Sequence, residues 1–250
     1  MKIKVTKKFW LRAIAAGFGA LALYWALLCF PQPFFHFSAR ANNLTLYSDQ
    51  PFDSEVGKQV LEMVEAKLAA SPLYSVGQQH AAFICNARWR QRLFFNRNYG
   101  AGGVNQYPLT TNIFLRDAVI EENRLLSSSG SQVLGDRTLA YFIAHEITHT
   151  LTVRAVGWFA YYRLPEWVRE GYADYVAKGD SFHYEEARRA FLDNAPEMDR
   201  EKSGLYLRYH LLVAYLLEKK HWGVQRLLEH PPEQKAVEEE VRGESMSMSR

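Results

Sequence analysis

Two histidines four residues apart constrain this chain more than any other feature. Residues 145–149 read His-Glu-Ile-Thr-His, inside a stretch, 136–153, that we predict to be a helix capped by Asp136. Residues four apart project from one face of a helix, so the imidazoles of His145 and His149 can reach the same metal ion. The pattern therefore predicts a helix that supplies two nitrogen ligands to one metal site.

Glu146 follows the first of these histidines directly. On a helix this position lies beside the metal without binding it. A carboxylate there can take a proton from a water molecule as that water attacks a carbonyl. We predict that Glu146 is a general base.

Catalytic zinc usually has three protein ligands, so two histidines require a further donor. Residues 164–175 read as a second helix, and Glu170 within it is the predicted third ligand. Asp174 lies one turn further along the same face. A carboxylate there can accept the spare ring N–H of a histidine ligand, and we assign that partner as His145.

The two segments together resemble the gluzincins, zinc metallopeptidases related to thermolysin, and especially the small membrane-linked members of that clan. The resemblance covers about residues 110–217 and is carried by the His-Glu-Ile-Thr-His motif and by W-x-x-E-G-x-A-D-Y at 167–175. It implies a zincin-like fold in which the two motif helices pack together around Zn²⁺. It also implies an edge strand upstream that aligns a peptide substrate, and the predicted strand at 112–116 occupies that place.

A further implication of the resemblance is a downstream tyrosine or histidine that donates a hydrogen bond to the tetrahedral oxyanion. The segment at 205–216 is similar to such a region. Tyr206 is the first choice for this catalytic role, and Tyr209 and His210 remain open.

The resemblance implies a zinc-dependent peptidase that acts on a peptide or protein substrate. One alternative is a membrane-anchored scaffold or binding protein that keeps the zinc site but is catalytically silent. The presence of Glu146 favours the enzyme, because a silent protein does not need the base. Hydrolysis of a non-peptide amide or ester is a third possibility.

The N-terminal segment predicts a membrane anchor. Residues 13–30 form an uncharged run of 18 residues, and residues 1–12 hold five basic residues and no acidic one. A bilayer needs about 20 apolar residues in a helix, and basic residues stay on the cytoplasmic side. We therefore expect an uncleaved single-pass helix with the rest of the chain outside the cytoplasm, facing the periplasm of a bacterium. The alternative is a cleaved signal peptide, although the only small-residue site, at 39–41, lies well beyond the run.

The remainder predicts one domain of the α+β class, with a small N-terminal mixed sheet and a mainly helical C-terminal half. We expect a linker at 31–43, the metallopeptidase domain at 44–230 and a disordered tail at 231–250, which is mostly polar and charged. Hydrophobic periodicity predicts a helix at 53–70 and strands at 44–47, 81–85 and 112–115.

Charge excludes a general nucleic-acid binder. The chain has 30 basic and 27 acidic residues, and without the five basic residues of the leader 25 remain against 27. A nearly neutral domain cannot draw affinity from neutralising phosphates. Two cysteines, one of them in the leader, also make a disulfide framework improbable.

Overall fold

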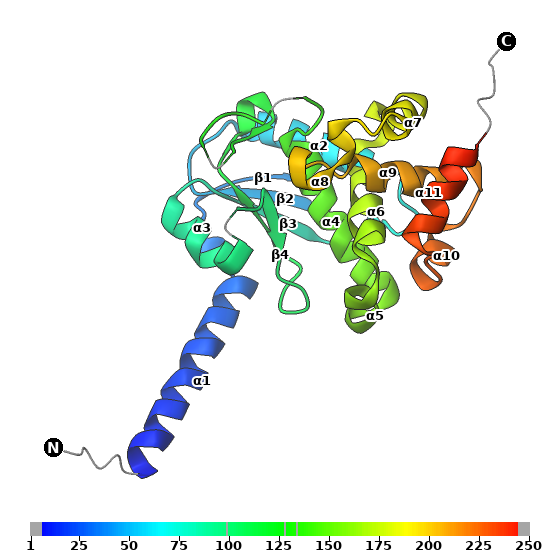
Figure 1. Ribbon diagram of the computed structural model, residues 1–250. Coiled ribbons are helices and arrows are strands. Elements are labelled where there is room, and N and C mark those ends of the chain that lie inside the picture. Colours follow the sequence, from blue (N-terminus) through cyan, green and yellow to red (C-terminus); the bar gives the residue numbers. More distant parts are fainter. Residues whose placement is uncertain (1–6, 99, 128, 134, 245–250) are drawn as a thin grey trace.

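The computed structural model describes residues 7–98, 100–127, 129–133 and 135–244. The fold is α+β: a mixed sheet forms from the N-terminal half, helices fill the C-terminal half, and one long helix projects from the domain (Figure 1). The α-helices are α1 Lys7–Cys29, α2 Ser54–Leu68, α3 Arg88–Phe95, α4 Leu139–Val156, α5 Trp158–Arg163, α6 Glu166–Lys178, α7 Tyr184–Leu192, α8 Arg200–Ser203, α9 Leu207–Ala214, α10 Val224–Glu229 and α11 Gln234–Gly243.

Five strands form the main sheet in the order β1-β2-β3-β5-β4. Strands β2, β3 and β5 run parallel, whereas the two outer strands, β1 and β4, are each antiparallel to their neighbour. The predicted mixed sheet is therefore confirmed. The strands are β1 Phe37–Ala41, β2 Leu44–Ser48, β3 His80–Cys85, β4 Gly103–Asn105 and β5 Ile113–Arg116, and a separate hairpin joins β6 Ala118–Val119 to β7 Arg124–Leu125.

The central strands bury both faces with different side chains. Phe83 of β3 and Phe114 of β5 are register partners, and their rings stack at 5.5 Å. Phe94 of α3 stacks on Phe114 at 4.4 Å, so α3 covers this aromatic face. Alternation turns Ile84 and Leu115 to the opposite face, where they join the larger core with residues of α2 and α4. The sheet thus holds α4 in a fixed position against its aliphatic side.

Helix α4 is the central helix of this core. It begins one residue after Thr138, whose hydroxyl accepts a hydrogen bond from the Tyr141 N–H at 3.2 Å, and it ends at Gly157, which has a φ of 81°. The helix is confirmed, but the predicted cap is wrong. Asp136 lies outside the helix and pairs with Lys178 at 3.0 Å.

Helix α6 confirms the predicted second helix and packs between α4 and α9. Its close approach to α9 depends on Gly171, because a Cβ added there would lie 2.6 Å from the Tyr209 carbonyl oxygen. A side chain would push the two helices apart. The glycine that follows Glu170 therefore has a packing role.

The predicted linker at 31–43 is wrong in part, because residues 37–41 form strand β1. Ser38 and Arg40 alternate with apolar residues in this short strand, which is held by antiparallel pairing with β2. Asn42, with a φ of 50°, provides the tight turn between the two strands.

The predicted disordered tail is also wrong for half of its length. Residues 234–243 form α11, which buries Val237 and Val241 in the main core. Two valines four apart are enough for a narrow apolar stripe on an otherwise charged helix. Residues 245–250 lie outside the described residues.

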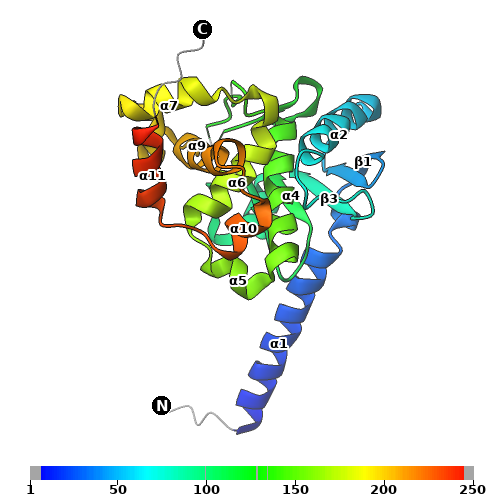
Figure 2. The ribbon, with the colours of Figure 1, turned by 90° about the vertical axis from the view of Figure 1, so that its right-hand side faces the viewer.

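Helix α1 is long and apolar enough to cross a membrane, and most of its surface is free of contact with the domain (Figure 2). Only its C-terminal end is attached. Leu28 is fully buried, the Tyr24 hydroxyl donates to the Leu93 carbonyl at 3.0 Å, and the Trp25 indole N–H donates to the Leu109 carbonyl at 3.0 Å. These contacts fix the direction in which α1 leaves the domain.

Candidate metal centre

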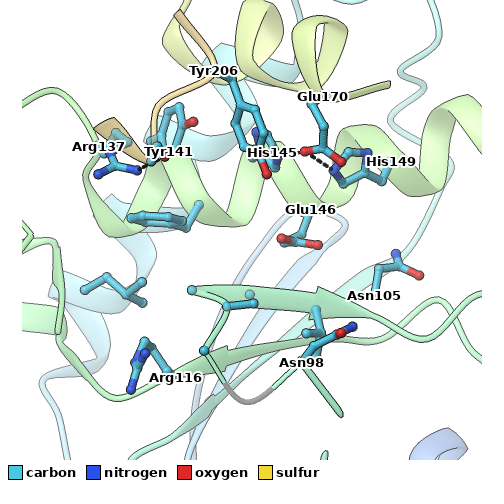
Figure 3. A pocket seen from close by; sticks show the side chains of 18 of the residues that line it. Asn98, Asn105, Arg116, Arg137, Tyr141, His145, Glu146, His149, Glu170 and Tyr206 are labelled. Carbon is cyan, nitrogen blue, oxygen red and sulfur yellow. Dashed lines mark hydrogen bonds and ion pairs between the residues drawn. The ribbon is translucent and has the colours of Figure 1, made fainter. Parts of the chain in front are cut away.

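The structure brings the three predicted ligands together at the contact between α4 and α6. Glu170 Oε2 lies 3.3 Å from His145 Nε2 and 3.6 Å from His149 Nε2, and the ligand atoms all lie within 4.8 Å of one another (Figure 3). His145 is buried, and the other two residues are partly exposed to a cavity. The group could hold a metal ion.

Two of the three separations between these donors, 3.3 Å and 3.6 Å, are close to those around a tetrahedral metal. Ligand atoms about 2.0–2.1 Å from a tetrahedral zinc lie about 3.3 Å from one another. Burial alone would raise the pKa of Glu170, but the charges and hydrogen bonds of His149 and His145 outweigh it and hold that pKa well below its usual range. Two imidazoles and an ionised carboxylate form a donor set found in catalytic zinc sites and also in iron(II) sites.

Glu146 lies on the side of α4 that faces the sheet, opposite β4 (Figure 3). Burial raises the pKa of its carboxyl group, and the charges of His149 and His145 offset only part of that rise. None of the described residues donates a hydrogen bond to this carboxylate. A Cβ added to Gly103 of β4 would lie 2.8 Å from Glu146 Cγ, so the glycine makes room for the side chain. The carboxylate is therefore free to act on a molecule in the cavity.

Of the three residues left open for the oxyanion, only Tyr206 lines the cavity. Its ring stacks on that of His145, with 5.6 Å between centroids and 16° between planes. Burial raises the pKa of Tyr206, and the nearby Glu170 carboxylate adds to this, so its hydroxyl stays protonated. Tyr209 and His210 belong to α9, and neither lines the cavity.

The role predicted for Asp174 is wrong. Its two oxygens accept hydrogen bonds from the Tyr141 hydroxyl and from His210 Nδ1, not from His145. His145 Nδ1 is buried and has no hydrogen-bond partner among the described residues. Asp174 lies one turn of α6 beyond Glu170. At that point the side chain is past the ligands and in the core, because α6 crosses α9 at Gly171.

Tyr161 of α5 provides the contact that sequence reasoning missed. Its hydroxyl lies 3.0 Å from His149 Nδ1, while Nε2 of the same ring faces Glu170. When Nε2 binds a metal, the proton of the ring is on Nδ1, and this N–H donates a hydrogen bond to the Tyr161 oxygen. The hydrogen bond fixes the tautomer and the ring orientation. The only sequence signal for this residue is its position in the short segment between the two motif helices.

A cavity of about 740 Å³ lies in front of the centre. Strand β4 forms one wall, and α4, α5 and α6 form the other. The predicted edge strand is therefore wrong: β5 is an inner strand, and β4 lies at the edge. No strand was predicted between 86 and 111, because a strand of three residues is too short to show periodicity.

Arginine side chains give this cavity a cationic lining that sequence reasoning did not anticipate. Four arginines line it, namely Arg116, Arg137, Arg169 and Arg200. Arg137 and Arg169 make no ion pair with any carboxylate in the described ranges. The only acidic residues among the described lining residues are Glu146 and Glu170. The described lining therefore carries more cationic than anionic side chains.

The centre thus combines a predicted ligand triad, a free carboxylate, a protonated tyrosine and a sheet edge around one cavity. No known family, no curated protein and no solved structure matches the chain.

Proposed function

We propose that this protein is a zinc-dependent peptidase of the gluzincin type. The observation that carries the proposal is the spacing of the three donor atoms of His145, His149 and Glu170, with the unpaired carboxylate of Glu146 facing the same cavity. A structural zinc site is usually closed by four protein ligands. Three ligands beside an open cavity are instead the arrangement of a catalytic site.

The residues around the cavity have distinct roles in this proposal. When bound, zinc would polarise a substrate carbonyl and lower the pKa of water to about 7. Glu146 accepts the proton of the attacking water and passes it to the departing amine, a task that its raised pKa suits. The Tyr206 hydroxyl donates a hydrogen bond to the developing oxyanion.

A peptide substrate is supported by the sheet edge. Strand β4 pairs with β5 on one side only, and its residues Gly103, Val104 and Asn105 all line the cavity. An extended peptide can add to such an edge through main-chain hydrogen bonds. The peptide would then lie beside β4, along the cavity that Glu146 and the two histidine ligands of α4 also line.

The proposed location is a membrane, with the catalytic domain outside the cytoplasm. Helix α1 supports a single span, and Lys7, Lys8 and Arg12 at its N-terminal end support a cytoplasmic N-terminus. A reporter enzyme that is active only in the cytoplasm tests the orientation when it is fused to the C-terminus. An active fusion would reverse the proposed topology.

Zinc content and peptide hydrolysis together test the function. We expect near one zinc per chain in the full-length protein purified in detergent, and a sharp loss in Glu170→Ala. Glu146→Gln should keep its zinc and lose about 10²- to 10⁴-fold in rate. Glu186→Gln, which changes an exposed glutamate of α7, is the matched control and should change neither.

The alternatives predict other results. A catalytically silent scaffold would bind zinc and show no hydrolysis, and its cellular function would survive Glu146→Gln. A hydrolase of non-peptide amides or esters would act on those members of a substrate panel and not on peptides. Absence of zinc from the wild-type protein after reconstitution would refute the metal site itself.

A further inference from the structure

Helix α5 presents an aromatic face that the domain does not cover. Trp158, Phe159 and Tyr162 are 53%, 56% and 54% exposed. Arg163 lies over the Phe159 ring, 4.0 Å from its centroid, and Arg154 is also exposed. No acidic residue occurs between Glu146 and Glu166 in the sequence, so this surface is aromatic and cationic. Large apolar groups gathered on a surface mark an interaction site.

This face lies on the side of the domain from which α1 projects. Figures 1 and 2, which are at right angles, both show α5 at the lower end of the domain, where α1 also leaves it. A series of hydrogen bonds joins the two helices. The Tyr162 hydroxyl donates to the Tyr107 carbonyl at 2.9 Å, and the Leu109 carbonyl accepts from Trp25 at 3.0 Å and from Cys29 at 3.2 Å. The chain between β4 and β5 therefore connects α5 to the C-terminal end of α1.

The chemistry of the face fits the headgroup region of a bilayer. Tryptophan and tyrosine concentrate at membrane interfaces, where their rings meet apolar chains and their polar atoms meet water. Arginines beside them attract lipid phosphates. The apolar run of α1 ends at the contacts with Leu109, which is itself 47% exposed. The interface of a bilayer spanned by α1 would thus lie at the level of the chain between β4 and β5.

We propose that the aromatic face of α5 lies in the headgroup region of the bilayer that α1 spans. Tyr161 and Tyr162 of the same helix line the cavity, and Tyr161 contacts His149. One end of the cavity therefore opens at the membrane surface. The substrates of the site are then polypeptide segments that lie at that surface. This part of the proposal rests on the proposed peptidase function.

Fluorescence quenching tests the position of α5 without any reference to hydrolysis. The full chain carries Cys29→Ser, and the second cysteine, Cys85, is buried with a pKa raised by that burial, so it does not react. An environment-sensitive fluorophore is attached through Phe159→Cys, through Leu21→Cys on α1 or through Glu186→Cys on α7, in separate proteins. Each protein is reconstituted into vesicles of phosphatidylcholine and phosphatidylglycerol that contain a nitroxide-labelled lipid.

We expect several-fold quenching and a blue-shifted emission at positions 159 and 21, and neither at 186. Quenching at 21 without quenching at 159 would overturn the proposal, because α1 would then be inserted while α5 stays in water. Equal quenching at 159 and 186 would also overturn it. Absence of quenching at 21 would remove the membrane span, and with it the docking of α5.

Peptide cleavage provides a separate test of the substrate class. Trp158→Ser combined with Phe159→Ser changes residues that do not line the cavity. We expect a several-fold lower rate on a peptide anchored to the vesicles by an acyl chain, and an unchanged rate on the same peptide free in solution. Equal rates of the wild type and the variant on the anchored peptide would refute the substrate class. No cleavage of either peptide by the wild type would refute the proposed function, and the quenching result would stand.

Discussion

Asp174 accepts a hydrogen bond from His210, with 2.8 Å between Oδ2 and Nδ1, and each side chain is only 1% exposed. Tyr141 donates to the other oxygen of the same carboxylate. Burial would raise the pKa of Asp174, but its hydrogen bond with His210 and the charge of Lys178 hold that pKa below its usual value. Burial lowers the pKa of His210, so the pair is best described as a carboxylate and a neutral imidazole. One buried anion thus connects α4, α6 and α9 behind the metal ligands.

We therefore expect Asp174→Ala to lower the free energy of unfolding by about 2–6 kcal/mol, because two buried hydrogen-bond donors each lose their partner at a cost of about 1–3 kcal/mol. The measurement is urea unfolding of the full chain in detergent, followed by circular dichroism. Asp193→Ala, at an exposed position, should stay within about 0.5 kcal/mol of the wild type. Loss of zinc from Asp174→Ala with unchanged stability would instead restore the ligand-orienting role.

Tyr161 should strengthen metal binding through His149. Tyr161→Phe removes the oxygen that lies 3.0 Å from Nδ1 and leaves the ring in place. Loss of such an outer contact typically weakens metal affinity by about 10- to 100-fold. Competition with a chelator measures the affinity for zinc. Tyr162→Phe, on the same helix but bonded to the Tyr107 carbonyl, is the control, and a similar loss there would contradict the assignment.

Tyr206 should act on the rate and not on binding. In Tyr206→Phe the ring still stacks on His145, but the donor to the oxyanion is lost. We expect kcat to fall by about 10²- to 10³-fold with KM and zinc content little changed. Tyr209→Phe is the matched control, because Tyr209 is three residues further along the chain and does not line the cavity. An equal effect of the two substitutions would exclude a specific role for Tyr206.

Gly103 should be required for the position of Glu146. In Gly103→Ala the new Cβ would lie 2.8 Å from Glu146 Cγ and 3.0 Å from Leu115 Cδ2, so the glutamate has to move. A displacement of about 1 Å can cost about 100-fold in rate. We expect kcat to fall toward that level while zinc is retained. Gly100→Ala is the control, since nothing lies within 4 Å of its added Cβ. Normal activity in Gly103→Ala would show that the carboxylate tolerates the shift.

The sequence located the ligands because their geometry is local. His145, Glu146 and His149 are fixed by the pitch of one helix, and Glu170 lies in a second helix. The partners of these residues depend on how helices cross. Spacing alone could not show that Asp174 faces the core. A rotation of α6 by part of a turn decides whether Asp174 contacts a histidine ligand or the core.

The fold, like the site, was predictable where it depends on local sequence pattern. Helices with regular apolar spacing and strands with apolar runs were found, and the class is α+β as expected. Strand order was not predictable. The pairing of β4 with β5 is made by backbone N–H and C=O groups, and because these groups are common to the residues of any strand, they leave no pattern in the sequence. As a result β4, which forms one wall of the cavity, was not among the predicted strands.

His80 predicts how the stability of this fold depends on pH. It begins β3, is only 4% exposed, and both ring nitrogens are buried without a hydrogen-bond partner among the described residues. Burial, with a smaller contribution from the Arg154 charge, lowers its pKa from 6.5 to about 4. Above pH 6.5 the ring is neutral in both the folded and the unfolded chain, so it has no effect on stability there.

As the pH falls below 6.5, the unfolded chain binds a proton at His80 and the folded chain does not, so the folded state loses stability down to about pH 4. A shift of about 2.5 units corresponds to roughly 3 kcal/mol, of which about 2 kcal/mol is lost by pH 5. We expect His80→Leu to lack this loss, because leucine does not titrate. The measurement is the difference in the free energy of urea unfolding between pH 7.5 and pH 5, in the wild type and in the variant. Since other groups titrate equally in both proteins, equal differences would mean that His80 takes up its proton in the folded state as readily as in the unfolded chain.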